Sequence, residues 1–176
     1  MNIAKFAGFA IGLGISVLLI FVIFRRLNTD GSTRTEYDER QKAVRGVGYM
    51  YGFYTAVAFF VVMMALDLLE ITIPAVDSVL YFTGLVVAGA VVTAYSILHD
   101  AYWGMNNNIQ FYTRFFIGIG GFNLVYGIWS IVSGSMIENG VLQLPFINLE
   151  AGLFIAGIGV LLLVKRGMDQ KEEAGE

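Results

Sequence analysis

The chain has 176 residues, of which 57% are hydrophobic and 14% are charged, and its mean hydropathy is +0.70. One soluble core of this size cannot bury so much apolar surface, which excludes an ordinary water-soluble enzyme and predicts an integral membrane protein. The net charge of -3 is no guide to partners, and a nucleic-acid partner lacks support because the basic residues are ordinary anchors of membrane topology. The absence of cysteine excludes disulfides and thiolate chemistry.

Five apolar stretches are long enough to cross a bilayer as helices, which takes about 18 or more residues with few charges. They cover residues 3–24, 46–66, 78–98, 115–133 and 147–164. The sequence therefore predicts an all-α membrane bundle of five transmembrane helices, with residues 1–176 as one membrane domain. The first stretch ends at Arg25 and Arg26 without a signal-peptide cleavage pattern, so we expect it to remain as an anchor.

The basic residues fall almost entirely on one side of these stretches. All Lys and Arg residues but Lys5 lie in the segments 25–45, 99–114 and 165–176. Short loops rich in Lys and Arg stay in the cytoplasm. We therefore expect the N-terminus outside, these segments inside, and residues 165–176 to form a cytoplasmic tail.

The segment 33–45, ahead of the second stretch, has the pattern of a juxtamembrane helix. Thr33 with Glu36 fits a capping box, and two acid–base pairs at a spacing of four residues follow. These pairs are Glu36 with Arg40 and Asp38 with Lys42.

The next basic segment, 99–114, should approach this helix because the second and third stretches are joined by a short loop. We expect Asp100 to pair with Arg40 or Arg45, within a solvated network of salt bridges. The predicted cytoplasmic docking surface comprises Asp38, Glu39, Arg40, Gln41, Arg45, His99, Asp100, Tyr102 and Trp103. One histidine among carboxylates without regular spacing does not predict a metal site, and no cofactor is predicted.

Small residues at helical spacing predict the faces on which the helices pack, such as Gly48 with Gly52 and Gly152 with Gly159. The corresponding face of the fourth stretch also carries polar groups, and Asn123, Tyr126 and Ser130 form a candidate intramembrane polar site. The Asn123 amide can bridge two helices or line a polar cavity, and the bridge is favoured.

The fifth stretch follows two turn signals, Asn139-Gly140 and Pro145, which predict a surface loop. Asn148 is expected to cap the helix, and Glu150 in its first turn suits the positive end of the helix dipole. No ionisable residue lies near the middle of any stretch, which disfavours a proton-coupled transporter or an intramembrane hydrolase.

Two short motifs carry a family resemblance. The run Asp38-Glu39-Arg40-Gln41 ahead of a Gly- and Tyr-rich stretch, with Asp100-Ala101-Tyr102 after the third stretch, resembles small multi-pass membrane proteins of Gram-positive bacteria that have no assigned activity. The likeness covers roughly the middle half of the chain. It implies a bacterial plasma (inner) membrane location and a shared role for the inner face.

The leading functional hypothesis is a non-enzymatic membrane protein that docks a cytoplasmic partner, or its own copies, through this inner face. The alternative is a small-molecule carrier or the substrate-binding membrane subunit of a transporter. An enzyme is the third hypothesis. It would need a general base, and His99, the only histidine of the chain, is the one obvious candidate.

Overall fold

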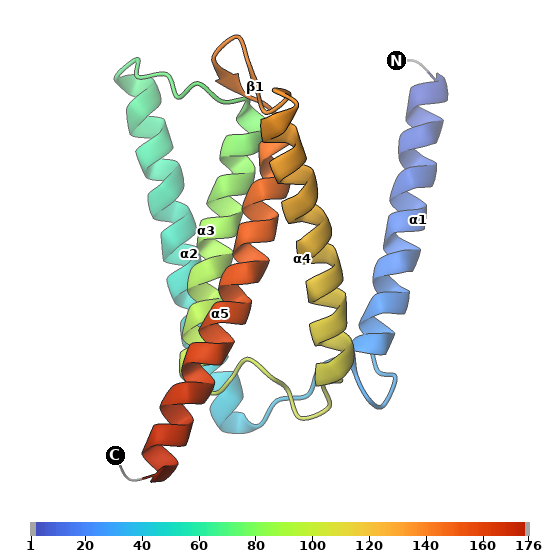
Figure 1. Cartoon of the computed structure of the whole chain (residues 1–176), viewed down its shortest axis with the longest axis vertical. Helices are drawn as coiled ribbons and strands as arrows, with labels where there is room; N and C mark the ends of the chain where they lie inside the picture. The colour runs from blue at the N-terminus through green and yellow to red at the C-terminus, as the bar shows by residue number, and fades with distance from the viewer. Residues whose placement is uncertain (1–2, 175–176) are drawn as a thin grey trace. The chain divides into compact units, whose positions relative to one another are not determined.

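The computed structural model describes the backbone of residues 3–174, and the side chains of this range except residues 3–10, 16 and 172–174. The chain is mostly α-helical (Figure 1). Its elements are α1 (Ile3–Leu27), α2 (Glu39–Leu68), α3 (Asp77–Leu98), α4 (Ile109–Val132), β1 (Ile137–Glu138), β2 (Val141–Leu142) and α5 (Phe146–Ala174).

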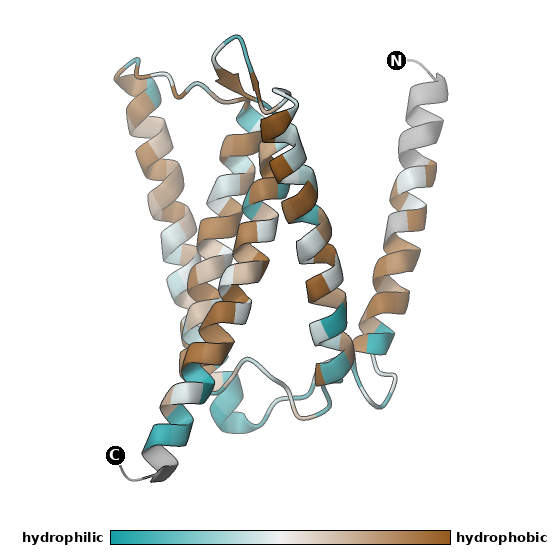
Figure 2. Ribbon diagram, in the orientation of Figure 1, coloured by the Kyte–Doolittle hydropathy of each residue, from teal (hydrophilic) through white to brown (hydrophobic). Residues whose placement is uncertain are grey.

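Four of the helices, α2 to α5, are long and apolar enough to cross a membrane (Figure 2). They correspond to four of the predicted stretches. The first stretch forms α1, a helix of 25 residues, but its first side chains, including that of Lys5, lie outside the described ones. Its role as a membrane span therefore stays a prediction, as does the orientation of the bundle.

The helices fall into two compact units. The first comprises Met1–Asp38 and Trp103–Arg114, and the second comprises Glu39–Tyr102 and Phe115–Glu176. Helix α4 thus begins in the first unit and continues into the second. The two units are described separately below.

In the second unit, α2 packs closely on α3 through glycine. A side chain at Gly52 would lie 3.2 Å from the Ala88 carbonyl oxygen and would overlap Val92, while one at Gly48 would lie 3.3 Å from the Tyr95 ring. Only glycine leaves space for such an approach between helices. The predicted packing face of α2 is confirmed.

The contact between α4 and α5 depends on glycines from both helices. A Cβ at Gly127 would lie 2.9 Å from the Leu149 backbone, and one at Gly152 would lie 2.8 Å from the Leu124 backbone nitrogen. A Cβ at Gly159 would meet no atom of another described element within 4 Å, so the predicted face of α5 is used at Gly152 and not at Gly159. The close contact therefore occupies only the first half of α5.

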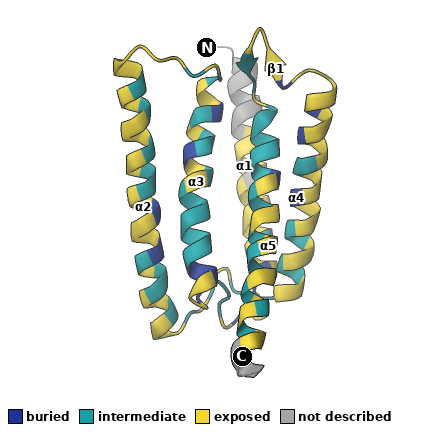
Figure 3. Ribbon diagram, turned by 60° about the vertical axis from the view of Figure 1, so that its left-hand side comes forward, coloured by how far each residue is buried: buried dark blue, intermediate teal, exposed yellow. Residues whose placement is uncertain are grey.

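Large apolar side chains point away from these contacts. Phe53, Leu85, Val125 and Leu163 are 65 to 70% exposed, and exposed positions run along each helix of this unit (Figure 3). Water would not tolerate so many exposed apolar side chains, whereas lipid tails solvate them.

The loop between α4 and α5 contains a two-residue hairpin. Strands β1 and β2 pair in register Ile137 with Leu142 and Glu138 with Val141. The turn residues Asn139 and Gly140 both have positive φ, 51° and 79°, as a type I′ turn requires. Here the predicted turn is confirmed, while the strands beside it were not predicted.

Several predicted boundaries are wrong. Residues 33–38 are not helical, so the capping box of Thr33 and Glu36 does not form, and α2 begins at Glu39. The reason lies in competing hydrogen bonds: the Glu36 N–H donates to Asn106 Oδ1 (2.8 Å), and the Glu36 carbonyl accepts from Met105 N–H (2.9 Å). These bonds satisfy the backbone of Glu36 outside a helix.

The other helix ends are also shifted. Helix α4 begins at Ile109, six residues before the predicted start, because Asn108 caps it through a bond from Phe111 N–H to its Oδ1 (3.1 Å). Helix α5 begins at Phe146, so Asn148 lies inside its first turn and is not the cap. Residues 165–174, the described part of the predicted cytoplasmic tail, continue this helix.

Candidate functional site

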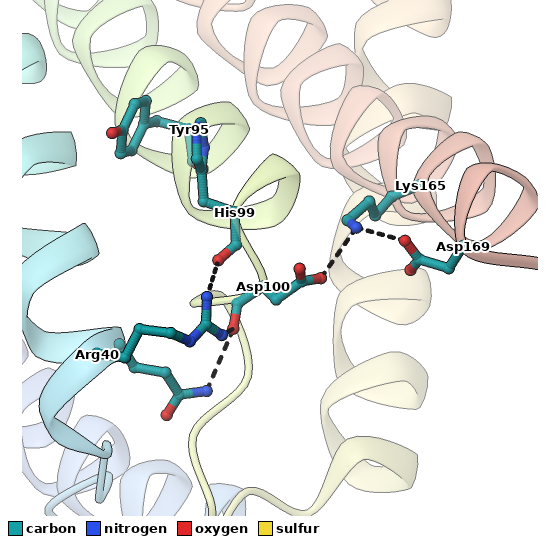
Figure 4. Close-up of polar contacts among 7 residues, drawn as sticks. Arg40, Tyr95, His99, Asp100, Lys165 and Asp169 are labelled. Atoms are coloured by element: carbon teal, nitrogen blue, oxygen red, sulfur yellow. Dashed lines mark hydrogen bonds and ion pairs between the residues drawn. The ribbon is translucent and has the colours of Figure 1, made fainter. Parts of the chain in front are cut away.

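At one end of the second unit, the first turns of α2 hold the loop that follows α3. Arg40 donates from Nη1 to the His99 carbonyl and from Nη2 to the Asp100 carbonyl, both at 3.1 Å (Figure 4). Gln41 donates to the same Asp100 carbonyl at 3.3 Å, and Arg45 donates to the Ala101 carbonyl at 3.2 Å. We call these three side chains of α2 and the carbonyls of residues 99–101 the anchoring cluster.

The end of α3 explains why this cluster forms. Asp100 takes the left-handed conformation (φ 56°), Ala101 N–H donates to the Ser96 carbonyl, and Asp100 N–H donates to the Ile97 carbonyl. This is a Schellman motif, which terminates the helix and turns the following carbonyls outward. The guanidinium groups of α2 satisfy those carbonyls and place positive charge at the negative end of the α3 dipole.

The predicted salt bridge of the Asp100 carboxylate with Arg40 or Arg45 is wrong. Arg40 and Arg45 bind backbone carbonyls, whereas the Asp100 carboxylate pairs with Lys165 of α5, at 3.1 Å from Nζ to Oδ1. Lys165 also pairs with Asp169 one turn further along α5 (Figure 4). The loop after α3 is therefore tied to α2 through its backbone and to α5 through its side chain.

His99 is positioned by the last turns of α3. Its Nδ1 lies 2.8 Å from the Tyr95 carbonyl oxygen, and its ring stacks on Tyr95 with a centroid distance of 4.1 Å. Because a carbonyl only accepts, Nδ1 must carry the proton, and Nε2 of the neutral ring can then only accept. Among the residues described, no group of three His, Cys, Asp or Glu side chains is arranged to hold a metal ion.

The structure brings together five of the nine predicted docking residues, namely Arg40, Gln41, Arg45, His99 and Asp100. Glu39 lies one residue before the cluster and pairs with Lys42 (2.7 Å), in place of the predicted pair between Asp38 and Lys42. Tyr102 is the last residue of this loop in the second unit. Asp38 and Trp103 belong to the first unit, where the Trp103 ring contacts Tyr112 edge to face.

The first unit has a polar network that the sequence did not predict. Asn106 is 8% exposed; its Oδ1 accepts from Glu36 N–H, and its Nδ2 donates to Asp30 Oδ2 and to the Arg34 carbonyl, both at 3.1 Å. Asn107 donates to Asn28 Oδ1 at 2.9 Å. The available signal was the run Asn106-Asn107-Asn108, since short amides of this kind bond to nearby backbone.

The Asp30 carboxylate is fully engaged in this network. Its Oδ1 accepts from Ser32 N–H (2.9 Å), while its Oδ2 accepts from Asn106. The hydrogen bond from the Asn106 amide, and then that from the Ser32 backbone, lower the pKa of Asp30 below its ordinary value. We call residues 28–36 and 104–108 the amide network.

Within α4, the predicted intramembrane site does not bridge helices. The Asn123 amide donates to the Ile119 carbonyl (2.7 Å), and the Ser130 hydroxyl donates to the Tyr126 carbonyl (2.8 Å). Both acceptors lie four residues earlier in the same helix, so these polar groups are satisfied locally. The favoured interpretation of Asn123 as a bridge is therefore wrong.

A polar contact between helices occurs instead at Glu150, which the sequence analysis had assigned to a helix-dipole role. Glu150 Oε1 accepts from the Thr83 hydroxyl of α3 at 2.6 Å, and its Oε2 is buried without a hydrogen-bond partner among the described residues. Glu150 also lines a cavity of about 670 Å³ between α3 and α5, whose other walls include Ala90 and Phe154.

Comparisons with protein-family models, with curated proteins and with solved structures give no match. The function is therefore inferred from the geometry of the chain itself. The anchoring cluster combines a loop whose backbone is held by hydrogen bonds with charged side chains of both signs. The cavity beside Glu150 is a second, apolar site of a different kind.

Proposed function

We propose that the chain is a non-enzymatic protein of the bacterial plasma membrane that docks a cytoplasmic protein partner at the anchoring cluster. It would cross the bilayer five times, with the N-terminus outside and the C-terminus inside. The observation that carries the proposal is the set of four hydrogen bonds from Arg40, Gln41 and Arg45 to the carbonyls of residues 99–101.

The anchoring favours docking because it fixes the loop before any partner arrives. Binding a mobile loop costs conformational entropy, and a loop already held in place avoids much of that cost. The anchors use backbone oxygens and not the Asp100 carboxylate. The Asp100 side chain is 57% exposed although it pairs with Lys165, and the side chain of neighbouring Glu39 is 91% exposed.

The membrane topology is supported by two independent features. Four helices have the required length and composition, and α1 has 25 residues of similar character. The basic residues other than Lys5 fall in the segments 25–45, 99–114 and 165–176, as expected for cytoplasmic segments. The bacterial location rests on the resemblance of the Asp38–Gln41 and Asp100–Tyr102 motifs.

Charge reversal at Glu39 is the direct test, because this side chain is exposed and takes no part in the anchoring. We expect Glu39→Lys to lose the partner that co-purifies with the wild-type chain in mild detergent. Glu138→Lys, an equal change on the hairpin, is the matched control and should retain it.

Arg40→Gln supplies a second arm, because it removes the anchor of the loop without placing a negative charge on the surface. It should also reduce the amount of bound partner. An unchanged set of bound proteins in both Glu39→Lys and Arg40→Gln would show that the docking proposal is wrong.

The cavity between α3 and α5 favours a second candidate function, a carrier or substrate-binding membrane subunit. Its walls are largely apolar and include Glu150, which suits a largely apolar ligand. A small molecule recovered with the wild-type chain and lost in Glu150→Gln would support this function. Equal recovery from both chains would exclude this cavity as its site.

A further inference from the structure

A cavity in the first unit lies where α1 ends and α4 begins. It has a volume of about 480 Å³ and is lined by Phe21, Val22, Arg25, Arg26, Asn28, Thr29, Gly31 and Asn108. Its lining contains two arginines and no acid. The position is distinct from the anchoring cluster, which belongs to the second unit.

Several N–H donors in this cavity make no hydrogen bond with the described residues. Arg25 uses its Nε for the Gly31 carbonyl (3.2 Å), which leaves its two Nη groups. Arg26 makes no hydrogen bond or ion pair with the residues that the structure describes, and within the same part of the chain the Asn108 side chain acts only as an acceptor, from Phe111 N–H. The lining can therefore offer several donors to one anion.

The acid nearest in sequence, Asp30, makes no ion pair with these arginines among the described residues. Both oxygens of Asp30 accept hydrogen bonds within the amide network, from Ser32 N–H and from the Asn106 amide. The N-terminus of α4 begins just after Asn108, so its dipole adds positive potential at this position. Charge and hydrogen bonding both favour an anionic group with several acceptor oxygens, such as a phosphate.

The apolar part of the lining indicates where that phosphate comes from. Phe21 and Val22 precede Arg25 and Arg26 by four residues, so each apolar side chain lies about one helical turn from an arginine on the same face of α1. Both are more than half exposed. A phospholipid matches this order, with its phosphate at the arginines and an acyl chain along Phe21 and Val22.

We propose that this cavity binds the headgroup of an anionic phospholipid at the membrane boundary. The inference rests on the proposed membrane span of α1, because only then do Phe21 and Val22 lie in hydrocarbon. Basic pockets beside membrane helices bind acidic lipid headgroups by the same chemistry. The bound lipid would fill the gap between the end of α1 and the start of α4.

The test uses the full chain in detergent micelles that contain equal amounts of phosphatidylglycerol and phosphatidylcholine. Retained lipid is measured by native mass spectrometry for the wild type, for Arg26→Gln and for Arg166→Gln. Arg166 is an exposed arginine at the basic end of α5 and gives the same change in net charge. Circular dichroism verifies that helix content is equal in all three chains.

We expect the wild type to retain phosphatidylglycerol over phosphatidylcholine, Arg26→Gln to weaken that retention about fivefold, and Arg166→Gln to leave it unchanged. Equal loss in both variants would mean diffuse attraction of basic residues to acidic lipid and would overturn the site. Displacement of the lipid by inorganic phosphate at the same concentration would also overturn it, since the apolar wall would then contribute nothing.

Fractionation of cells separates this inference from the proposed topology. Recovery of the chain in the membrane fraction, with no preference for phosphatidylglycerol, would overturn the lipid site alone. Recovery in the soluble fraction would overturn the membrane span and the site together.

Discussion

Two polar loops of this protein are ordered by different chemistry. In the anchoring cluster, long charged side chains from α2 reach the carbonyls of residues 99–101 in the loop that follows the neighbouring helix α3. In the amide network, short neutral side chains such as Asn106 and Asn107 bond to backbone and side chains within their own unit. The first loop is held by arginine side chains of another helix, α2, and the second by amide side chains of its own residues, such as the buried Asn106. Salt, pH and mutation should therefore affect the two loops differently.

The largest effect is expected at Asn106. Asn106→Ala removes three hydrogen bonds and leaves the partly buried Glu36 N–H and Arg34 carbonyl without their partner. The free energy of unfolding should fall by about 3 kcal/mol, since each unsatisfied buried group costs about 1–3 kcal/mol. Denaturant unfolding in micelles measures this loss.

Asn123→Ala is the matched control for that measurement. Its amide bonds only within α4, so we expect less than about 1 kcal/mol of destabilisation. Equal losses in the two variants would contradict the distinction between a network and a local contact.

A smaller effect is expected at Arg40. Arg40→Gln removes the contacts with the His99 and Asp100 carbonyls, but both lie at an exposed surface where water replaces the guanidinium. A loss of about 1 kcal/mol is expected, confined to the loop. Amide hydrogen exchange should become faster at residues 99–103 and stay unchanged at residues 30–36. Faster exchange in both segments would show that the two loops are not independent.

Salt should separate the loops without any mutation. The pair between Lys165 and Asp100 is partly exposed and is worth at most about 1 kcal/mol, and about 1 M salt shortens the screening length to roughly 3 Å. Hydrogen exchange of the 99–103 loop should accelerate modestly at high salt, while the amide network should not respond. Asp100→Asn should abolish the salt response, and its persistence in that variant would assign it to other charges.

The smallest effect is the acid sensitivity of the amide network. The pKa of Asp30 is lower in the folded chain than its ordinary value of 3.8, so its ionised form is stabilised by folding. That contribution is fully present above pH 3.8 and is lost as the pH falls through the lower, folded pKa. Exchange of the Ser32 N–H should accelerate in this acidic range, and Asp30→Asn should remove the dependence. An unchanged pH profile in that variant would contradict the role of Asp30.

The sequence predicted the fold better than it predicted the polar contacts. Apolar length identifies a helix because the signal is summed over some twenty residues, and α2 to α5 all lie where expected. The end of a helix depends on a few hydrogen bonds, and at residues 33–38 the partner is Asn106, about seventy residues away in the chain. A capping pattern is read from neighbouring residues, so it cannot reveal a hydrogen-bond partner as distant in the chain as Asn106.

The candidate site shows the same limit at the level of single atoms. The proximity of Arg40 to Asp100 was predicted from the order of the helices, but the bonded atom is a carbonyl and not the carboxylate. That choice depends on the left-handed turn at Asp100, which only the backbone reveals. The sequence also contains no sign of the hydrogen bond between Glu150 and Thr83, because Thr83 lies on another helix. Glu150 was therefore assigned only to the helix dipole.

Helix α2 continues for 30 residues without a proline, from Glu39 beside the anchoring cluster to Leu68. Such a helix is about 45 Å long, half again the roughly 30 Å of a bilayer's hydrocarbon core. It contains no proline, and two of its glycines, Gly48 and Gly52, lie against α3. If α2 crosses a bilayer, about 15 Å of it, or some ten residues, must extend beyond the hydrocarbon core.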